Sequence, residues 1–272
     1  MSIIINAQEL KEKIENDNVA IIDVRTKGGE FETGKAAYEH SHLPGALYLD
    51  MEKDVAGQNG FMPEADKLAD KLGSLGIDRN TPVVLYDDSN HRAASKSWFV
   101  LHYLGHEAAY VLDGGFRAWI EAGYEVTENI PTTIPTTYKA KLKKELVVDI
   151  DEMKRKLNEE NSALIDSRSR DRYIGRNEPK YKKAGHIPGA KNYHAKQVFN
   201  REGRWKTEAK LKRIFSDLRD TDEIVVSCGS GNSACMNAVA LKEAGFQNVK
   251  LFPGGFSEWI EDDSNEVVKG ED

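Results

Sequence analysis

Short apolar runs rich in β-branched residues alternate along the chain with longer segments of helical composition. The run at 83–86 precedes such a segment at 94–104, and the run at 224–227 precedes one at 233–244. Apolar runs of this length are typical of strands buried on both faces, and helical crossovers are what join parallel strands. The pattern predicts an α/β fold with mostly parallel sheets flanked by helices.

The pattern occurs twice, because three motifs recur in the same order. An apolar run ending in Asp-x-Arg, a His-x-Pro-Gly-Ala motif and a Gly-Gly-Phe-x-x-Trp motif each have two copies, at offsets between 140 and 144. The copies are 19–25 and 162–168, 42–46 and 186–190, 111–119 and 251–259. A nearly constant offset indicates a tandem duplication of one domain.

Prolines and threonines followed by lysines mark the junction between the copies. We expect residues 1–127 to form one domain, 128–145 an extended linker, and 146–272 the second domain. Within each copy a glycine, Gly105 or Gly245, closes a helical segment and suits the left-handed conformation that ends helices.

Composition and charge narrow the function classes. The 272 residues carry a net charge of -7, which does not favour nucleic-acid binding. The first residues lack the pattern of a signal peptide, and no run approaches membrane-spanning length, so we expect a cytoplasmic protein without membrane or nucleic-acid partners. Two cysteines, Cys228 and Cys235, are too few for a disulfide framework or a thiolate zinc site, and no metal or other cofactor is expected.

Cys228 directly follows an apolar run and opens a loop of small residues that leads into a helix near Ala234. Backbone N–H groups and the helix dipole can stabilise a sulfur anion at such a point, so a thiolate nucleophile is expected. Gly229 and Gly231 permit a tight cradle, and Ser230 offers a hydroxyl. A turn with a merely buried cysteine is the alternative.

The first copy serves as an internal control for that alternative. The repeat offset aligns Cys228 with Asp88. A charged residue at the equivalent position argues against a packing role for Cys228 and favours one catalytic and one supporting domain. Cys235 lies within the following helix and is expected to be a packing residue.

The ordered motifs, together with the six-residue loop led by Cys228, resemble the tandem rhodanese-type sulfurtransferases across essentially the whole chain. The resemblance implies that Cys228 takes the outer sulfur of a small anionic donor and passes the persulfide sulfur to a thiol, cyanide or a protein acceptor. It also implies that backbone amides hold the persulfide, those of Gly229, Gly231, Asn232 and Ser233 included.

The loop also bears on the donor. Relatives that use thiosulfate usually have basic residues after the cysteine, whereas those that use 3-mercaptopyruvate usually have Gly-Ser-Gly, as here. The absence of a loop cation favours 3-mercaptopyruvate, with thiosulfate as the alternative. A proposed cysteine-serine-aspartate relay in similar enzymes implies Ser230 and Asp50, with the site partly at the domain interface. An exposed loop acid is the other interpretation of Asp50.

The resemblance also implies Arg172, in the segment Arg-Tyr-Ile-Gly, as the residue that meets the substrate carboxylate, and Lys180 as a second basic residue. Arg25 and Arg168 occur in both copies, as do the histidines of the His-x-Pro-Gly-Ala motifs, so structural roles are expected for them. The loop departs from the family at Asn232 and Ser233, where Val-Thr is common, and Lys180 replaces a frequent arginine.

Two other functions match part of this pattern. A cysteine phosphatase needs an arginine about six residues after its cysteine, and position 234 is alanine. A non-enzymatic rhodanese-like module usually lacks the cysteine, which is present here. The physiological acceptor, the oligomeric state and any redox role of Cys235 do not follow from the sequence.

Overall fold

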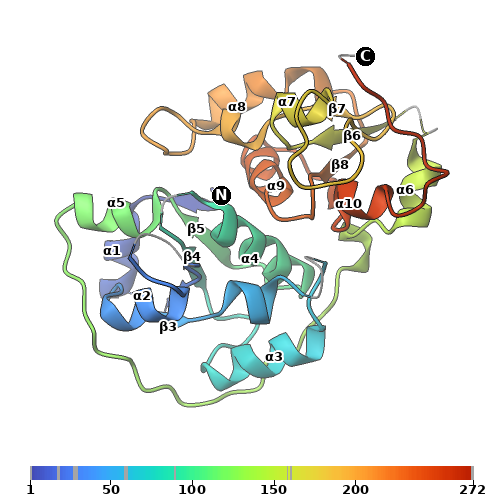
Figure 1. Cartoon of the computed structure of the whole chain (residues 1–272). Coiled ribbons are helices and arrows are strands. Elements are labelled where there is room, and N and C mark those ends of the chain that lie inside the picture. The colour runs from blue at the N-terminus through green and yellow to red at the C-terminus, as the bar shows by residue number, and fades with distance from the viewer. Residues whose placement is uncertain are drawn as a thin grey trace. The chain divides into compact units, whose positions relative to one another are not determined.

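The computed structural model describes residues 2–16, 19–26, 30–57, 61–88, 90–157, 159 and 161–270 (Figure 1). The chain divides into two compact units. The first unit comprises Met1–Gln58, Met62–Lys143 and Asn200–Trp205, and the second comprises Asn59–Phe61, Lys144–Phe199 and Lys206–Asp272. None of the helices in these described ranges is long and apolar enough to cross a membrane.

The first unit is built on one parallel sheet with the strand order β1-β5-β4-β2-β3. Its elements are β1 (Ile4–Ile5), α1 (Ala7–Asn16), β2 (Ala20–Asp23), α2 (Gly34–His40), β3 (Leu47–Tyr48), the π-helix η1 (Met51–Val55), α3 (Ala65–Ser74), β4 (Val83–Tyr86), α4 (Arg92–Tyr103), β5 (Ala109–Leu112) and α5 (Gly115–Glu121). The four residues of β4 are buried, as expected for a central strand covered on both faces.

The second unit repeats this plan with the parallel order β7-β6-β8-β9. Its elements are η3 (Lys144–Leu146), α6 (Ile150–Lys156), β6 (Ser162–Asp166), α7 (Arg170–Tyr173), β7 (Lys191–Asn192), η4 (Ala195–Val198), α8 (Glu208–Ile214), η5 (Ser216–Leu218), β8 (Glu223–Ser227), α9 (Ala234–Glu243), β9 (Val249–Leu251) and α10 (Gly255–Trp259). The predicted α/β class with two mostly parallel sheets is confirmed.

The predicted helices after the central strands are also confirmed, with small shifts of their ends. The first one begins at Arg92, two residues earlier than expected, and the second begins at Ala234. Gly105 and Gly245 follow these helices with φ of 81° and 96°, the left-handed conformation that their position predicted. Both helices pack on the strands of their own sheet, and α9 is buried over most of its length.

Candidate functional site

The backbone at Cys228 is fixed by α10. Cys228 follows β8 directly and is 2 % exposed. Its carbonyl accepts a hydrogen bond from Phe256 N at 2.8 Å, and the carbonyl of Gly229 accepts one from Ser257 N at 2.9 Å. A Cβ on Gly255, whose φ is 56°, would lie 2.5 Å from the Cys228 carbonyl oxygen, so this close approach requires glycine. The second Gly-Gly-Phe motif therefore anchors the cysteine loop.

The loop between Cys228 and α9 turns sharply and presents backbone donors. Gly231 has a φ of 70°, and a Cβ there would lie 2.4 Å from the carbonyl oxygen of Pro253. The amides from Gly229 to Ala234 donate to no acceptor among the residues that the structure describes. Orphan N–H groups at a helix N-terminus form a ready site for an anion.

The first unit contains the equivalent loop, and the sheet registers define the correspondence. Asp23 pairs with Tyr86 in the first sheet, and Asp166 pairs with Ser227 in the second. The residue after Tyr86 is Asp87, and its carbonyl accepts from Phe116 N at 2.8 Å as that of Cys228 accepts from Phe256 N. The equivalent of Cys228 is thus Asp87.

The alignment of Cys228 with Asp88 was therefore wrong. It applies the same offset that relates the left-handed residues His91 and Gly231. The segment that leads to this left-handed residue from Asp87 is, however, one residue longer than the segment that leads to it from Cys228. The residue at the place of Gly229 is Asp88, whose carbonyl accepts from Arg117 N at 3.2 Å. The inference from that alignment remains, because the equivalent residue is again an aspartate.

The carboxylate of Asp87 is enclosed by backbone amides. Its Oδ1 accepts from His91 N at 3.1 Å, and its Oδ2 accepts from Ala93 N at 3.1 Å and Ala94 N at 3.2 Å. The residue is 2 % exposed. Among the residues that the structure describes, the donors to the buried Asp87 side chain are backbone amides at the start of a helix, where N–H groups have no partner within the helix.

The register of the two helices identifies the equivalent donors in the second unit. His91 has a φ of 57° and Gly231 a φ of 70°, so the left-handed residue before each helix corresponds. The amides equivalent to those of His91, Ala93 and Ala94 belong to Gly231, Ser233 and Ala234. Of these, Gly231 and Ser233 were expected from the sequence and Ala234 was not.

Cys235 has a packing role, as expected. It is fully buried in the first turn of α9, closer to the helix start than the sequence suggested. Its thiol donates to the Gly231 carbonyl at 3.3 Å. The contact ties the helix to the loop and directs the thiol of Cys235 at a backbone oxygen.

Arg172 is held by a carboxylate that the sequence analysis had not assigned. Glu178 accepts from Arg172 Nε at 3.0 Å and Nη2 at 2.8 Å, and from Arg168 Nη1 at 3.2 Å. Burial alone would lower the pKa of Arg172, but the hydrogen bonds and charge of Glu178 outweigh it and raise that pKa. One edge of the Arg172 guanidinium is occupied, and Nη1 is the nitrogen that makes no bond to Glu178.

Three other candidate residues, Lys180, Ser230 and Asn232, differ in exposure and in hydrogen bonding. Lys180 is exposed, and its backbone amide donates to Glu178 at 3.0 Å. The hydroxyl of Ser230 donates to no group in the described part of the chain and is partly exposed. The side-chain oxygen of Asn232 is buried without a partner among those residues.

Asp50 belongs to the first unit, where it caps a helix. Its Oδ1 accepts from Glu52 N and Lys53 N, both at 3.1 Å, at the N-terminus of the π-helix η1. The carboxylate is 26 % exposed and lies 3.7 Å from Lys53 Nζ. A catalytic role for Asp50 stays a prediction beside this structural one.

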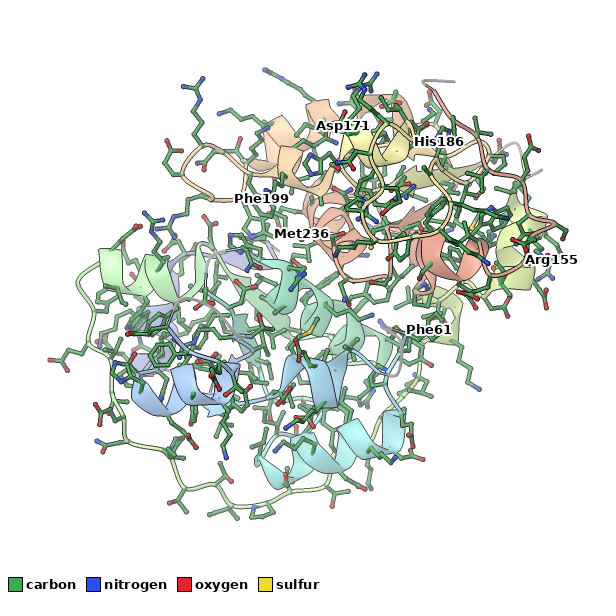
Figure 2. All side chains as sticks on the ribbon, viewed as in Figure 1. Phe61, Arg155, Asp171, His186, Phe199 and Met236 are labelled. Carbon is green, nitrogen blue, oxygen red and sulfur yellow. The ribbon has the colours of Figure 1, made fainter. Side chains whose placement is uncertain are left out.

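The residues shared by both copies are structural, as expected. Arg25 pairs with Asp23 at 2.7 Å and Arg168 with Asp166 at 2.6 Å, and both arginines are buried. His42 and His186 are fully buried and bond to backbone carbonyls of their own units. Figure 2 shows His186 among the side chains of the second unit.

Sequence reasoning missed Glu178 and Tyr181 as parts of the site. A Cβ on Gly229 would lie 2.6 Å from the Tyr181 hydroxyl, so the phenol sits against the cysteine loop. The signal available in the sequence was weak, because the basic segment 168–183 contains a second carboxylate, Asp171, and a second tyrosine, Tyr173.

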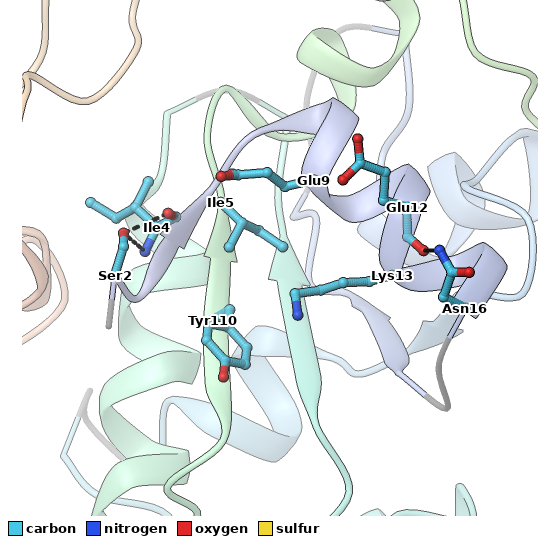
Figure 3. Close-up of a pocket in the computed structure, with 8 residues that line it drawn as sticks. All are labelled: Ser2, Ile4, Ile5, Glu9, Glu12, Lys13, Asn16 and Tyr110. Atoms are coloured by element: carbon cyan, nitrogen blue, oxygen red, sulfur yellow. Dashed lines mark hydrogen bonds between the residues drawn. The ribbon is translucent and has the colours of Figure 1, made fainter.

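Surface hollows occur away from the cysteine loop. A cavity of about 440 Å³ in the first unit lies beside β1 and α1, where Lys13 stands 5.6 Å from the centroid of the Tyr110 ring (Figure 3). A cavity of about 240 Å³ is lined by Arg25, Tyr48 and Asp50 among others. Neither contains a cysteine.

Comparison with known proteins identifies the family of the chain. A model of the rhodanese-like domain matches residues 6–122 and again 149–262. The chain belongs to the rhodanese-like family. A probable 3-mercaptopyruvate sulfurtransferase of Pseudomonas aeruginosa is 34% identical over 98% of both chains, and a thiosulfate sulfurtransferase of Cricetulus griseus is 32% identical over 82% of this chain and 78% of that one. The rhodanese-like chain is a sulfurtransferase, as its motifs predicted.

Solved structures show the same fold. The wild-type structure of EanB has a TM-score of 0.86 at 24% identity, and it covers 98% of this chain and 69% of that chain. The crystal structure of YnjE has a TM-score of 0.84 at 22% identity, with 99% and 69% covered. A sulfurtransferase of this fold acts on a sulfur donor and a sulfur acceptor.

Proposed function

We propose that this rhodanese-like chain transfers sulfur from 3-mercaptopyruvate through a persulfide on Cys228 to a thiol, cyanide or a protein acceptor. The observation that carries the proposal is the loop after Cys228, which offers backbone amides and no cation. The equivalent loop of the first unit supports it, because three backbone amides there donate to the oxygens of the buried Asp87 side chain.

The chemistry needs a sulfur anion and a proton source. The Cys228 thiolate attacks the sulfur of 3-mercaptopyruvate, so that an S–S bond forms and the C–S bond breaks. The electron pair goes to the carbon left behind, and one proton completes pyruvate. An acceptor thiolate then attacks the outer sulfur and releases Cys228 as a thiolate. The amides of Gly231, Ser233 and Ala234 hold the persulfide anion.

The remaining site residues have separate roles in this proposal. The Ser230 hydroxyl, with Asp50 as a further member of the relay, delivers the proton to the leaving enolate. Arg172 meets the substrate carboxylate through Nη1, while Glu178 holds its other edge. Lys180 adds positive charge at the exposed rim, and Gly229 and Asn232 complete the loop.

Thiosulfate is the alternative donor. It carries two charges, and a loop without lysine or arginine gives the second charge no direct partner. The relatives' names include both donors, so the donor rests on the loop and on Arg172. The division of the chain at 127/128 and 145/146 and a cytoplasmic location likewise belong to the proposal.

The test compares the two donors in steady-state assays, with Cys228→Ser as the blank. We expect a higher kcat/KM with 3-mercaptopyruvate and a mass increase at Cys228 that corresponds to one sulfur atom. Equal or greater efficiency with thiosulfate would overturn the donor. Absence of the mass increase with either donor would overturn persulfide transfer at Cys228.

A further inference from the structure

Gly229 and Tyr181 fit each other closely. The three nearest atoms to a Cβ built on Gly229 all belong to Tyr181, at 2.6 Å for the hydroxyl oxygen, 3.2 Å for Cε2 and 3.3 Å for Cζ. Gly229 is not among the glycines with positive φ, so its backbone would accept alanine. The tyrosine, rather than the backbone, accounts for glycine at this position.

Tyr181 also contacts the proposed carboxylate binder. The guanidinium carbon of Arg172 lies 5.3 Å from the centroid of the Tyr181 ring. Cations at this distance from an aromatic face are attracted by its quadrupole. Since Glu178 holds the other side of Arg172, the guanidinium is fixed between a carboxylate and a ring.

Further contacts connect Tyr181 and Arg172 to the cysteine loop. Tyr181 tilts against Phe256 at 6.1 Å between centroids, and Arg168 lies 4.0 Å from the Phe256 ring centroid. Glu178 joins Arg168 to Arg172. Phe256 N also donates to the Cys228 carbonyl. These contacts therefore link the position of Arg172 to that of Cys228.

The described residues of the first unit show part of this arrangement. Arg25 lies 4.1 Å from the Phe116 ring centroid, as Arg168 does on Phe256. At the place of Gly229, however, stands Asp88, whose side chain is accommodated. The tight fit between a glycine and a tyrosine thus occurs in the unit with the cysteine.

We propose that Tyr181 is a positioning residue that holds Arg172 beside the Cys228 loop and thereby favours donors that carry a carboxylate. The proposal rests on the proposed function. Tyr181 is partly exposed, and its hydroxyl lies against Gly229 of the loop. A fixed distance between guanidinium and sulfur suits 3-mercaptopyruvate, in which carboxylate and sulfur are separate groups, and gives thiosulfate no such advantage.

The first test compares KM and kcat for the two donors in Tyr181→Leu and Tyr181→Phe. We expect Tyr181→Leu to raise KM for 3-mercaptopyruvate about fivefold with little change in kcat, and to leave kcat/KM for thiosulfate within about twofold. Tyr181→Phe keeps the ring and should stay near wild type. A matched control is Tyr110→Leu, which removes the ring beside Lys13 in the first unit. Equal losses for both donors in Tyr181→Leu would reduce Tyr181 to a packing residue and overturn the proposal.

The second test is rescue. We expect Gly229→Ala to lower kcat/KM with 3-mercaptopyruvate because its methyl group displaces Tyr181, and Gly229→Ala/Tyr181→Leu to lose no more than Tyr181→Leu alone. Additive losses in the double variant would refute the coupling. The gain of sulfur at Cys228 is also measured in the wild-type protein with either donor. That measurement distinguishes a failure of the Tyr181 proposal from a failure of the proposed function.

Discussion

Asp87 in the first unit occupies the position that Cys228 occupies in the second. Each residue follows the central strand, each has a carbonyl bonded by the phenylalanine of the Gly-Gly-Phe motif at 2.8 Å, and each is 2 % exposed. One carries a carboxyl group and the other a thiol. Both units have thus kept the same cradle of backbone amides after the central strand, with an aspartate in one unit and a cysteine in the other.

A first prediction concerns the carboxylate in that cradle. Asp87→Asn replaces one accepting oxygen with an NH₂ group that faces backbone donors, and unsatisfied buried groups cost about 1–3 kcal/mol. We expect lower stability of the first unit and faster hydrogen exchange at the amides of His91, Ala93 and Ala94, measured by mass spectrometry. Asp88→Asn is the matched neighbour and should change exchange little. Unchanged exchange in Asp87→Asn would contradict the cradle.

The fold could be predicted because its signals are local and occur twice. The apolar runs gave the central strands, and the repeat gave the two sheets. The residue of the first unit that corresponds to Cys228 could not be identified from the sequence. The one-residue difference between the two loops is visible only once the pairing of Asp23 with Tyr86 and of Asp166 with Ser227 is known.

Residue types and motifs indicate candidate residues for the site, but they do not indicate the contacts between those residues. Cys228, Gly231 and Arg172 have recognisable patterns in the sequence. The partner of Arg172 depends on how the chain folds back at Glu178, and the fit of Tyr181 to Gly229 joins residues far apart in the sequence. Such contacts leave no periodic pattern, so residue types alone do not indicate them.

A second prediction concerns the pH dependence of stability. Burial raises the pKa of Glu258, and the Asp149 carboxylate raises it further. The folded state therefore binds the proton more tightly than the unfolded state. Ionisation of Glu258 costs stability as the pH rises from the ordinary carboxyl value through its folded pKa.

Glu258→Gln removes that cost. We expect the variant to unfold at a higher temperature than wild type at about pH 8, with the difference vanishing towards about pH 4, where both side chains are neutral. Glu261→Gln, at an exposed position nearby, should show no such dependence. A difference between Glu258→Gln and wild type that is independent of pH would contradict the assignment.

A third prediction separates the two roles of Asp50. Asparagine is as good an N-cap as aspartate, whereas alanine loses the cap of η1 at a cost of about 1 kcal/mol. If the carboxylate serves the relay with Ser230, Asp50→Asn and Asp50→Ala should both lower kcat with 3-mercaptopyruvate about tenfold or more. Only the alanine variant should also lower the melting temperature. Full activity in Asp50→Asn would leave Asp50 with the cap alone, and the proton would then have to come through Ser230 from another source.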